Sequence, residues 1–187
     1  MQTRVPYPRE ELVKKSSTSL PQRIAAFSYA LPMRHVHATA TLDCGSAVAE
    51  ALIPKFFELQ KDRSGAAHMI LEVPLDDLGL PTHAAIAREV EVRITRERDE
   101  DNLNDVFRVI WTPARGGPFP DFNGTMIVWS EDDPDRGFIE LNGDYKPAGA
   151  VGEALDVAMG HRIAERTAKH FLDKIADGIS ALRTTNA

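Results

Sequence analysis

Hydrophobic and polar residues alternate along several stretches of the chain. Residues 34–42 read RHVHATATL, with Val36, Ala38, Ala40 and Leu42 at every second position. Successive side chains of a strand point to opposite faces, so this stretch is predicted to be a half-buried strand. Related patterns, bounded by turn residues, predict further strands at residues 67–73, 84–98, 105–112, 122–131 and 138–145.

Two stretches have helical character. Residues 47–60 follow a turn in which Ser46 can cap a helix, but Pro54 lies inside them. Proline removes a backbone donor and clashes with the preceding turn, so we expect two short helices or one helix with a sharp kink. Residues 151–182 form the other stretch and predict the one long helix.

The second half of this terminal helix has an ordinary amphipathic pattern. At about 100° per residue, one sector collects its apolar side chains: Ala164, Thr167, Ala168, Phe171, Leu172, Ile175, Ile179 and Leu182. In the first half the same sector holds small side chains and one imidazole: Ala154, Val157, Ala158, His161 and Ala164. Since unfilled interior volume is costly, small residues facing a large sheet predict a space for another molecule.

Bulky residues of the first half point more than a quarter turn away from that sector: Leu155, Met159 and Ile163. Three alternatives stay open. The small residues could allow close backbone packing with no cavity. A kink at Gly160 would turn Leu155 and Met159 into the core. In a straight helix these two would contact another subunit, as in a homodimer, or the apolar residues 23–31.

The order of elements predicts an α+β fold. Short connections between successive strands favour antiparallel neighbours. We expect a curved antiparallel sheet of about six strands wrapped around a long C-terminal helix, with two short helices after the first strand. Residues 1–33, rich in Pro, Ser, Arg and Lys, are expected to be an N-terminal extension that is partly disordered.

Composition narrows the function. The 187 residues carry a net charge of −6, which argues against nucleic acid as the main partner. No apolar run approaches the roughly 20 residues that span a bilayer, so no stable membrane insertion is expected. Cys44 is the single cysteine and no secretory signal is visible, which predicts a cytoplasmic protein.

Glycine and aromatic positions late in the chain carry a family resemblance. They are Phe122-x-Gly124, then Leu141-x-Gly143-x-Tyr145-x-Pro147, then Gly152-x-x-x-Asp156-x-x-x-Gly160 before the long helix. This arrangement resembles the START-like (helix-grip) superfamily, the polyketide cyclase/dehydrase and lipid-transport group (SRPBCC). By element order the resemblance covers residues 34–182. It implies that residues 34–187 are a ligand-binding domain with an elongated apolar cavity between sheet and terminal helix, and it implies no universal catalytic triad.

Eight residues are predicted to line that cavity: Phe107, Trp111, Met126, Trp129, Tyr145, Val157, Ala158 and His161. Aromatic and apolar groups with a few polar tips are what small-molecule pockets use. Plain core filling is the alternative for each of them. The facing of residues 122–131 is ambiguous, since Met126 and Val128 oppose Ile127 and Trp129. His161 could contact a ligand or act as an acid or base, or it could be a structural histidine bonded to backbone or to Glu72.

No metal site, cofactor or catalytic residue is predicted. His35 and His37 share a strand face, a spacing that metals can use, but they oppose the apolar set and are expected to be exposed. Residues 115–117 and 143–145 lack the context of a phosphate-binding motif, and turn chemistry explains them. The Asp and Glu runs at residues 99–101 and 131–133 are expected to be solvated turns.

The leading hypothesis is binding of a small hydrophobic or amphipathic ligand, such as a lipid, quinone, polyketide or aromatic compound. One alternative is an enzyme of the cyclase, dehydratase or hydrolase type, with His161 as general acid/base. Another is a protein-interaction module that uses Leu155, Met159 and the N-terminal extension.

Overall fold

The computed structural model describes residues 33–63, 65–79, 81–98, 105–115, 119–146 and 157–185. All of them belong to the unit Leu31–Ala187. Apart from Met33, the predicted N-terminal extension lies outside the described residues, and so do Ala154 and Leu155. The division into an extension and a domain at residues 33 and 34 stays a prediction.

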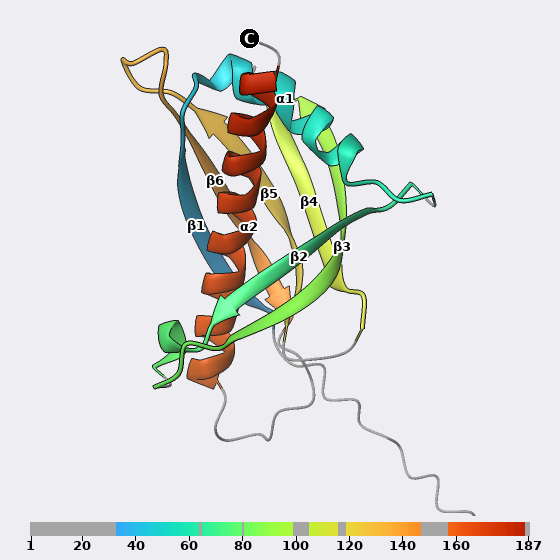
Figure 1. Ribbon diagram of the computed structural model, residues 1–187, viewed down its shortest axis with the longest axis vertical. Helices are drawn as coiled ribbons and strands as arrows, with labels where there is room; N and C mark the ends of the chain where they lie inside the picture. Colours follow the sequence, from blue (N-terminus) through green and yellow to red (C-terminus); the bar gives the residue numbers. More distant parts are fainter. Residues whose placement is uncertain are drawn as a thin grey trace, which may run out of the picture. The chain divides into compact units, whose positions relative to one another are not determined.

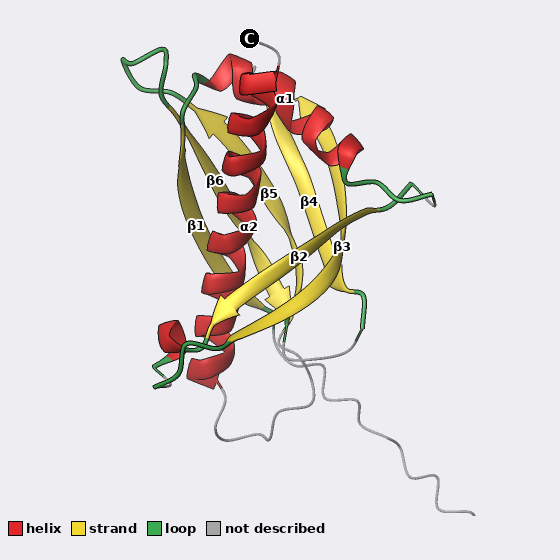
Figure 2. Ribbon diagram, viewed as in Figure 1, coloured by secondary structure: helices red, strands yellow, loops and turns green. Residues whose placement is uncertain are grey.

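Six strands form one antiparallel sheet in the order β1-β6-β5-β4-β3-β2 (Figures 1 and 2). Their bounds agree with the alternating stretches of the sequence to within two residues: β1 Arg34–Leu42, β2 Ala67–Pro74, β3 Ala85–Arg98, β4 Asp105–Pro113, β5 Asp121–Trp129 and β6 Gly137–Lys146. The first strand pairs with the last, and β2 is the opposite edge. The predicted curved antiparallel sheet of about six strands is confirmed.

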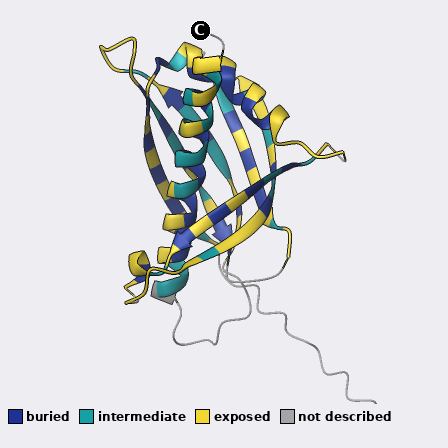
Figure 3. Cartoon of the chain, in the orientation of Figure 1, coloured by how far each residue is buried: buried dark blue, intermediate teal, exposed yellow. Residues whose placement is uncertain are grey.

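The terminal helix α2, Val157–Thr185, crosses the inner face of the curled sheet and contacts both edge strands (Figure 1). Alternate strand residues turn inward and are buried, as the banding of Figure 3 shows. The predicted apolar sector of the second half of α2 is also confirmed, because its members from Ala164 to Ile179 are buried and Leu182 is partly buried. Burial of these two facing surfaces supplies the main stabilisation of the fold.

The chain after β1 forms one helix and not two. The chain forms a single helix, α1, Ser46–Leu59, with Pro54 inside it, so the expectation of two short helices is wrong. The buried stripe of α1 continues on both sides of the proline, from Leu52 and Ile53 to Phe56 and Phe57. A proline inside a helix costs about 3 kcal/mol. Burying each phenylalanine contributes about 1.5–3 kcal/mol, which offsets that cost and keeps the helix in one piece.

A pair of glycines allows an aromatic stack to form on the sheet. Gly124 of β5 lies opposite Gly143 of β6. A Cβ on either residue would lie within 2.8 Å of the facing backbone and of the ring of Phe122. The ring therefore occupies the place that two side chains would take. Trp111 stacks on Phe122 with ring centroids 4.1 Å apart, and Phe171 of α2 packs on Trp111 at 4.9 Å.

A short 3-10 turn, η1, Asp76–Leu78, contacts α2 on the flank of its first half. Leu78 is buried, and Arg166 of α2 forms an ion pair with Asp77 at 3.6 Å. This turn lies between the strands predicted at residues 67–73 and 84–98. Ile163 is only 7% exposed and Met159 packs against the core, although both lie outside the predicted sector of small residues.

Among the residues that the structure describes, no helix combines the length and the apolar character needed to cross a membrane.

Candidate functional site

The predicted site residues fall into three groups. Phe107, Trp111, Met126 and Tyr145 are all buried on the inner face of the sheet. Trp129 lies on the outer face, 37% exposed, with its ring stacked on Phe138. Met126 and Val128 are therefore the inward set of β5, which resolves the ambiguity in its facing. Val157 and Ala158 begin α2, and their side chains are not among those described. The role of all eight residues in ligand binding stays a prediction.

The structure joins two of the predicted residues by a hydrogen bond. Tyr145 at the end of β6 and His161 in the second turn of α2 lie with Oη and Nδ1 3.1 Å apart. Nε2 of His161 lies 3.3 Å from a carboxylate oxygen of Glu165, one turn further along the helix. With the imidazole proton on Nε2, the Tyr145 hydroxyl donates its hydrogen bond to Nδ1 of His161. Glu165 can form an ion pair with His161 when the imidazole is protonated.

The surroundings of Tyr145 act on its phenol in opposite directions. Burial raises the pKa of Tyr145 above its usual value, because the phenolate would lose its water. Arg34, its neighbour in the β1–β6 register, lowers that pKa by its charge and by hydrogen bonding, and Glu165 raises it. The net shift is upward, so the phenol keeps its proton near neutral pH.

Three other histidines have identifiable neighbours. His35 and His37 are exposed on the outer face, as predicted, beside Asp144 at 3.3 Å and Glu140 at 3.1 Å. His170 of α2, rather than His161, contacts the backbone of Glu72. In the described part of the chain, no group of three or more His, Cys, Asp or Glu side chains could hold a metal ion.

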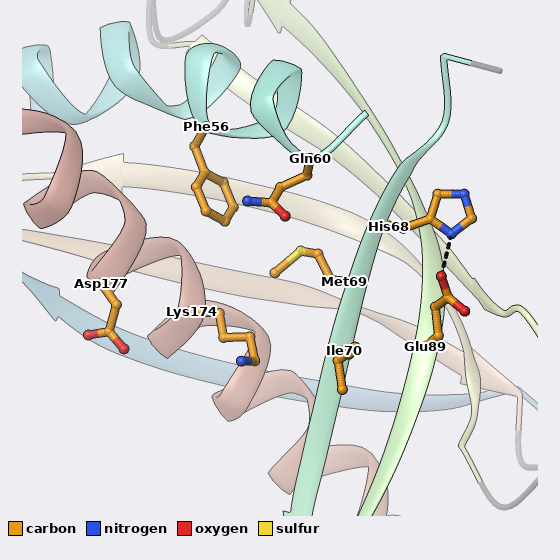
Figure 4. Close-up of a pocket in the computed structure, with 8 residues that line it drawn as sticks. All are labelled: Phe56, Gln60, His68, Met69, Ile70, Glu89, Lys174 and Asp177. Carbon is orange, nitrogen blue, oxygen red and sulfur yellow. Dashed lines mark hydrogen bonds and ion pairs between the residues drawn. The ribbon is translucent and has the colours of Figure 1, made fainter. Parts of the chain in front are cut away.

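A cleft of about 530 Å³ opens between α1, the edge strand β2 and the second half of α2. Its apolar wall includes Phe56 of α1 and Met69 of β2, both nearly buried. Figure 4 shows these two side chains and Gln60 directed into the same space, with Lys174 and Asp177 reaching it from α2. Ile70, His68 and Glu89 complete the lining. None of the eight predicted site residues belongs to it.

Three polar groups of this cleft have no partner among the described residues. The ammonium of Lys174, the side-chain amide of Gln60 and the carboxylate of Asp177 form no hydrogen bond or ion pair there. Lys174 is partly buried, whereas Gln60 and Asp177 are exposed at the rim. Apolar walls with a few unpaired polar groups are typical of small-molecule sites. The sequence contained no signal for this cleft, because its lining comes from α1, β2, β3 and α2, which no local pattern relates.

The space predicted beside the first turns of α2 remains a prediction. A Cβ built on Gly160 would meet no atom within 4 Å, so this side of the helix is open among the described residues. Residues 147–156, which lead into the helix, lie outside the described part of the chain.

Comparisons with known proteins give likenesses of structure only. No protein-family model matches the chain, and no curated protein sequence matches it. One similar solved structure is a Thermus thermophilus protein, with 12% identity over 80% of this chain and 99% of the other, at a TM-score of 0.46. A START superfamily protein from Mycobacterium smegmatis shares 12% identity over 81% of this chain and 99% of its own, at 0.42. An aromatase/cyclase from a Streptomyces species shares 14% identity over 82% and 90%, at 0.35.

The fold assignment rests on the geometry rather than on these likenesses. Six antiparallel strands in the order β1-β6-β5-β4-β3-β2 curl around the long helix α2, and α1 follows the first strand. This is the helix-grip fold that the START-like resemblance implies.

Proposed function

We propose that the protein binds a small amphipathic ligand in the cleft between α1, β2 and α2. The observation that carries this proposal is the cleft itself, about 530 Å³ in volume, with an apolar wall and three polar groups that lack partners. Sites for small molecules have volumes of about 300–1,000 Å³ and this mixed lining. The cleft borders the second half of α2, whereas the sequence predicts the ligand beside the first half of that helix.

The apolar wall would supply most of the affinity. Burial of apolar surface contributes about 25 cal/mol per Å². Phe56 and Met69 are nearly buried, so the surface that is removed from water would be mainly that of the ligand itself and of the exposed Ile70. The polar groups of Lys174 and Gln60 would orient the ligand, because each gains a hydrogen bond that it lacks in the empty cleft. Lipids, quinones, polyketides and aromatic acids all have an apolar body with a polar end.

The test is a calorimetric titration of the protein with undecanoate, an apolar chain with one carboxylate. Filling the cleft with Gln60→Trp should weaken undecanoate binding at least tenfold, which is about 1.4 kcal/mol. The matched control is Leu59→Trp, because Leu59 is the exposed neighbour of Gln60 and does not line the cleft. Unaltered affinity in Gln60→Trp, or equal loss in both variants, would contradict this placement of the ligand.

A second candidate function is proton-transfer catalysis at the front of α2. The observation that favours it is the hydrogen bond between Tyr145 and His161 at 3.1 Å, with the Glu165 carboxylate 3.3 Å from the other ring nitrogen of His161. A base held by a third group and bonded to a hydroxyl is the arrangement by which enzymes activate that hydroxyl. On this proposal His161 is the general acid/base, with a contribution of about 10²–10⁴-fold to the rate.

Hydrolysis of nitrophenyl octanoate gives a simple assay of this second function. His161→Gln should lower the hydrolysis rate while undecanoate binding is retained. His35→Gln, which changes an exposed histidine on the outer face, should leave the rate unchanged. Equal rates in wild type and both variants would rule out His161 as the acid/base for this reaction.

A further inference from the structure

The edge strand β2 presents its outward backbone groups at residues 68, 70 and 72. Glu91, Glu89 and Ala87 face these residues across β2–β3. The carbonyl of Glu89 accepts from Ala114, on the far side of β3, so Glu89 does not bond to Ile70. In an antiparallel ladder, pairs without mutual hydrogen bonds, such as Ile70 and Glu89, alternate with hydrogen-bonded pairs. The N–H and C=O of Ile70 therefore point away from β3, toward the free edge.

Both neighbours of Ile70 along this edge already have partners. The N–H of His68 donates to the carbonyl of Gln60 at 3.1 Å, where the chain after α1 forms a bridge between Lys61 and Ala67. The N–H of Glu72 donates to Nδ1 of His170 on α2 at 3.0 Å. No described residue bonds to the outward N–H and C=O of Ile70. The open edge is one residue long, and Ile70 is part of the cleft lining.

We infer that the ligand of this cleft carries a secondary amide that pairs with the backbone of Ile70. The amide carbonyl accepts from the Ile70 N–H, and the amide N–H donates to the Ile70 carbonyl, as a neighbouring strand would. An apolar acyl group on one side of the amide lies against Phe56 and Met69. An anionic group on the other side meets Lys174, which is partly buried and unpaired, whereas Asp177 is exposed to water at the rim. The ligand class is an N-acyl amino acid.

The length of the open edge separates this ligand from a peptide strand. An extended peptide would need the outward N–H groups of residues 68 and 72 as well, and these donate to Gln60 and His170. One amide fits the edge without breaking either bond. The inference rests on the proposed function, because it specifies the ligand of the same cleft.

Three compounds of equal chain length test the inference by calorimetry: N-octanoylglycine, its ester isostere octanoyloxyacetate, and undecanoate. The amide should bind about tenfold more tightly than the ester, because the ester loses a donor and places an oxygen against the Ile70 carbonyl. Equal affinities of all three compounds would overturn the inference and leave the proposed function standing. Failure of all three to bind would overturn both.

Ile70→Pro removes the outward N–H without breaking a hydrogen bond of the β2–β3 ladder. Edge strands tolerate proline. In this variant the preference for amide over ester should fall to about twofold or less, whereas Ile70→Ala, which keeps the N–H, should retain it.

If Ile70→Pro does not fold, the Ile70 amide proton of the wild type gives the answer by NMR. Slower hydrogen exchange at Ile70 with N-octanoylglycine, but not with undecanoate, is expected, and unchanged exchange would overturn the inference. Tighter binding of an acetylated hexapeptide of alternating Val and Thr would overturn the single-amide ligand.

Discussion

Two glycines of α2, Gly160 and Gly178, provide a matched pair of alanine substitutions. Neither has a positive φ among the described residues, so alanine fits the backbone at both. Alanine is favoured over glycine inside a helix by about 0.8–1.0 kcal/mol. A Cβ at Gly160 would meet nothing within 4 Å, whereas one at Gly178 would lie 2.3 Å from two ring atoms of Phe56. The two variants share the gain in helix propensity and differ in packing.

The magnitudes predict opposite outcomes. Gly160→Ala should stabilise the protein by about 0.5–1 kcal/mol, the lower value because the residue lies in the first turn of α2. For a chain of this length that corresponds to a rise in Tm of about 1–4 °C. At Gly178 the Phe56 ring must retreat by about 1 Å to reach ordinary contact. Overpacking of this kind costs about 1–3 kcal/mol, so Gly178→Ala should gain nothing or lose up to about 2 kcal/mol.

Thermal unfolding followed by far-ultraviolet circular dichroism measures both variants against wild type. The cleft gives a second readout, since the displaced Phe56 ring would enter it and weaken undecanoate binding in Gly178→Ala only. A Tm of Gly178→Ala equal to or above that of Gly160→Ala would refute the packing argument. A lower Tm for Gly160→Ala would refute the claim that space lies beside the first turns of α2.

Three further predictions concern single contacts. Tyr145→Phe removes the hydroxyl that bonds to His161 and Arg34 and should destabilise the protein by about 1 kcal/mol, as measured by urea unfolding; an unchanged midpoint would mean that these bonds add nothing to stability in solution. Burial raises the pKa of Glu50, so the carboxyl has a higher pKa in the folded than in the unfolded protein. The stabilisation by the protonated carboxyl is therefore present at low pH and is lost as pH rises through the folded pKa. Glu50→Gln should therefore raise Tm at pH 7, and the gain should shrink toward pH 4; a gain that is constant with pH would contradict the shift. Gly124→Ala places a Cβ 2.4 Å from the carbonyl oxygen of Asn142, a backbone atom that cannot move aside, and should cost more than about 3 kcal/mol or prevent folding; a Tm near that of wild type would show that the two strands can separate.

The sequence predicts the sheet well because most strands have one solvent-exposed and one buried face, which gives an alternating pattern. Where both faces of a strand carry apolar residues, the alternation does not show which face is buried. In β5 either Met126 or Trp129 could face the core, and the structure places Met126 inside and Trp129 on the outer face, where it stacks on Phe138. The prediction of two short helices around Pro54 fails for a different reason. The local cost of this proline is real, but the tertiary burial of Phe56 and Phe57 outweighs it.

The candidate site is harder to predict than the fold. The sequence singles out both Tyr145 and His161 as candidate site residues, but it does not predict the hydrogen bond between them. The cleft depends instead on the distance at which the end of α1 stands from β2, which tertiary packing decides. The open backbone of Ile70 depends on strand register, and the side chain of an exposed isoleucine gives no hint of it.

The facing glycines of β5 and β6 have a consequence for how this chain can evolve. Phe122 lies where their side chains would be, so positions 122, 124 and 143 share a single volume. A larger residue at position 124 or 143 requires a smaller side chain at position 122 and a shift of the facing strand at the same time. Homologues are therefore expected to vary at these three positions together or not at all.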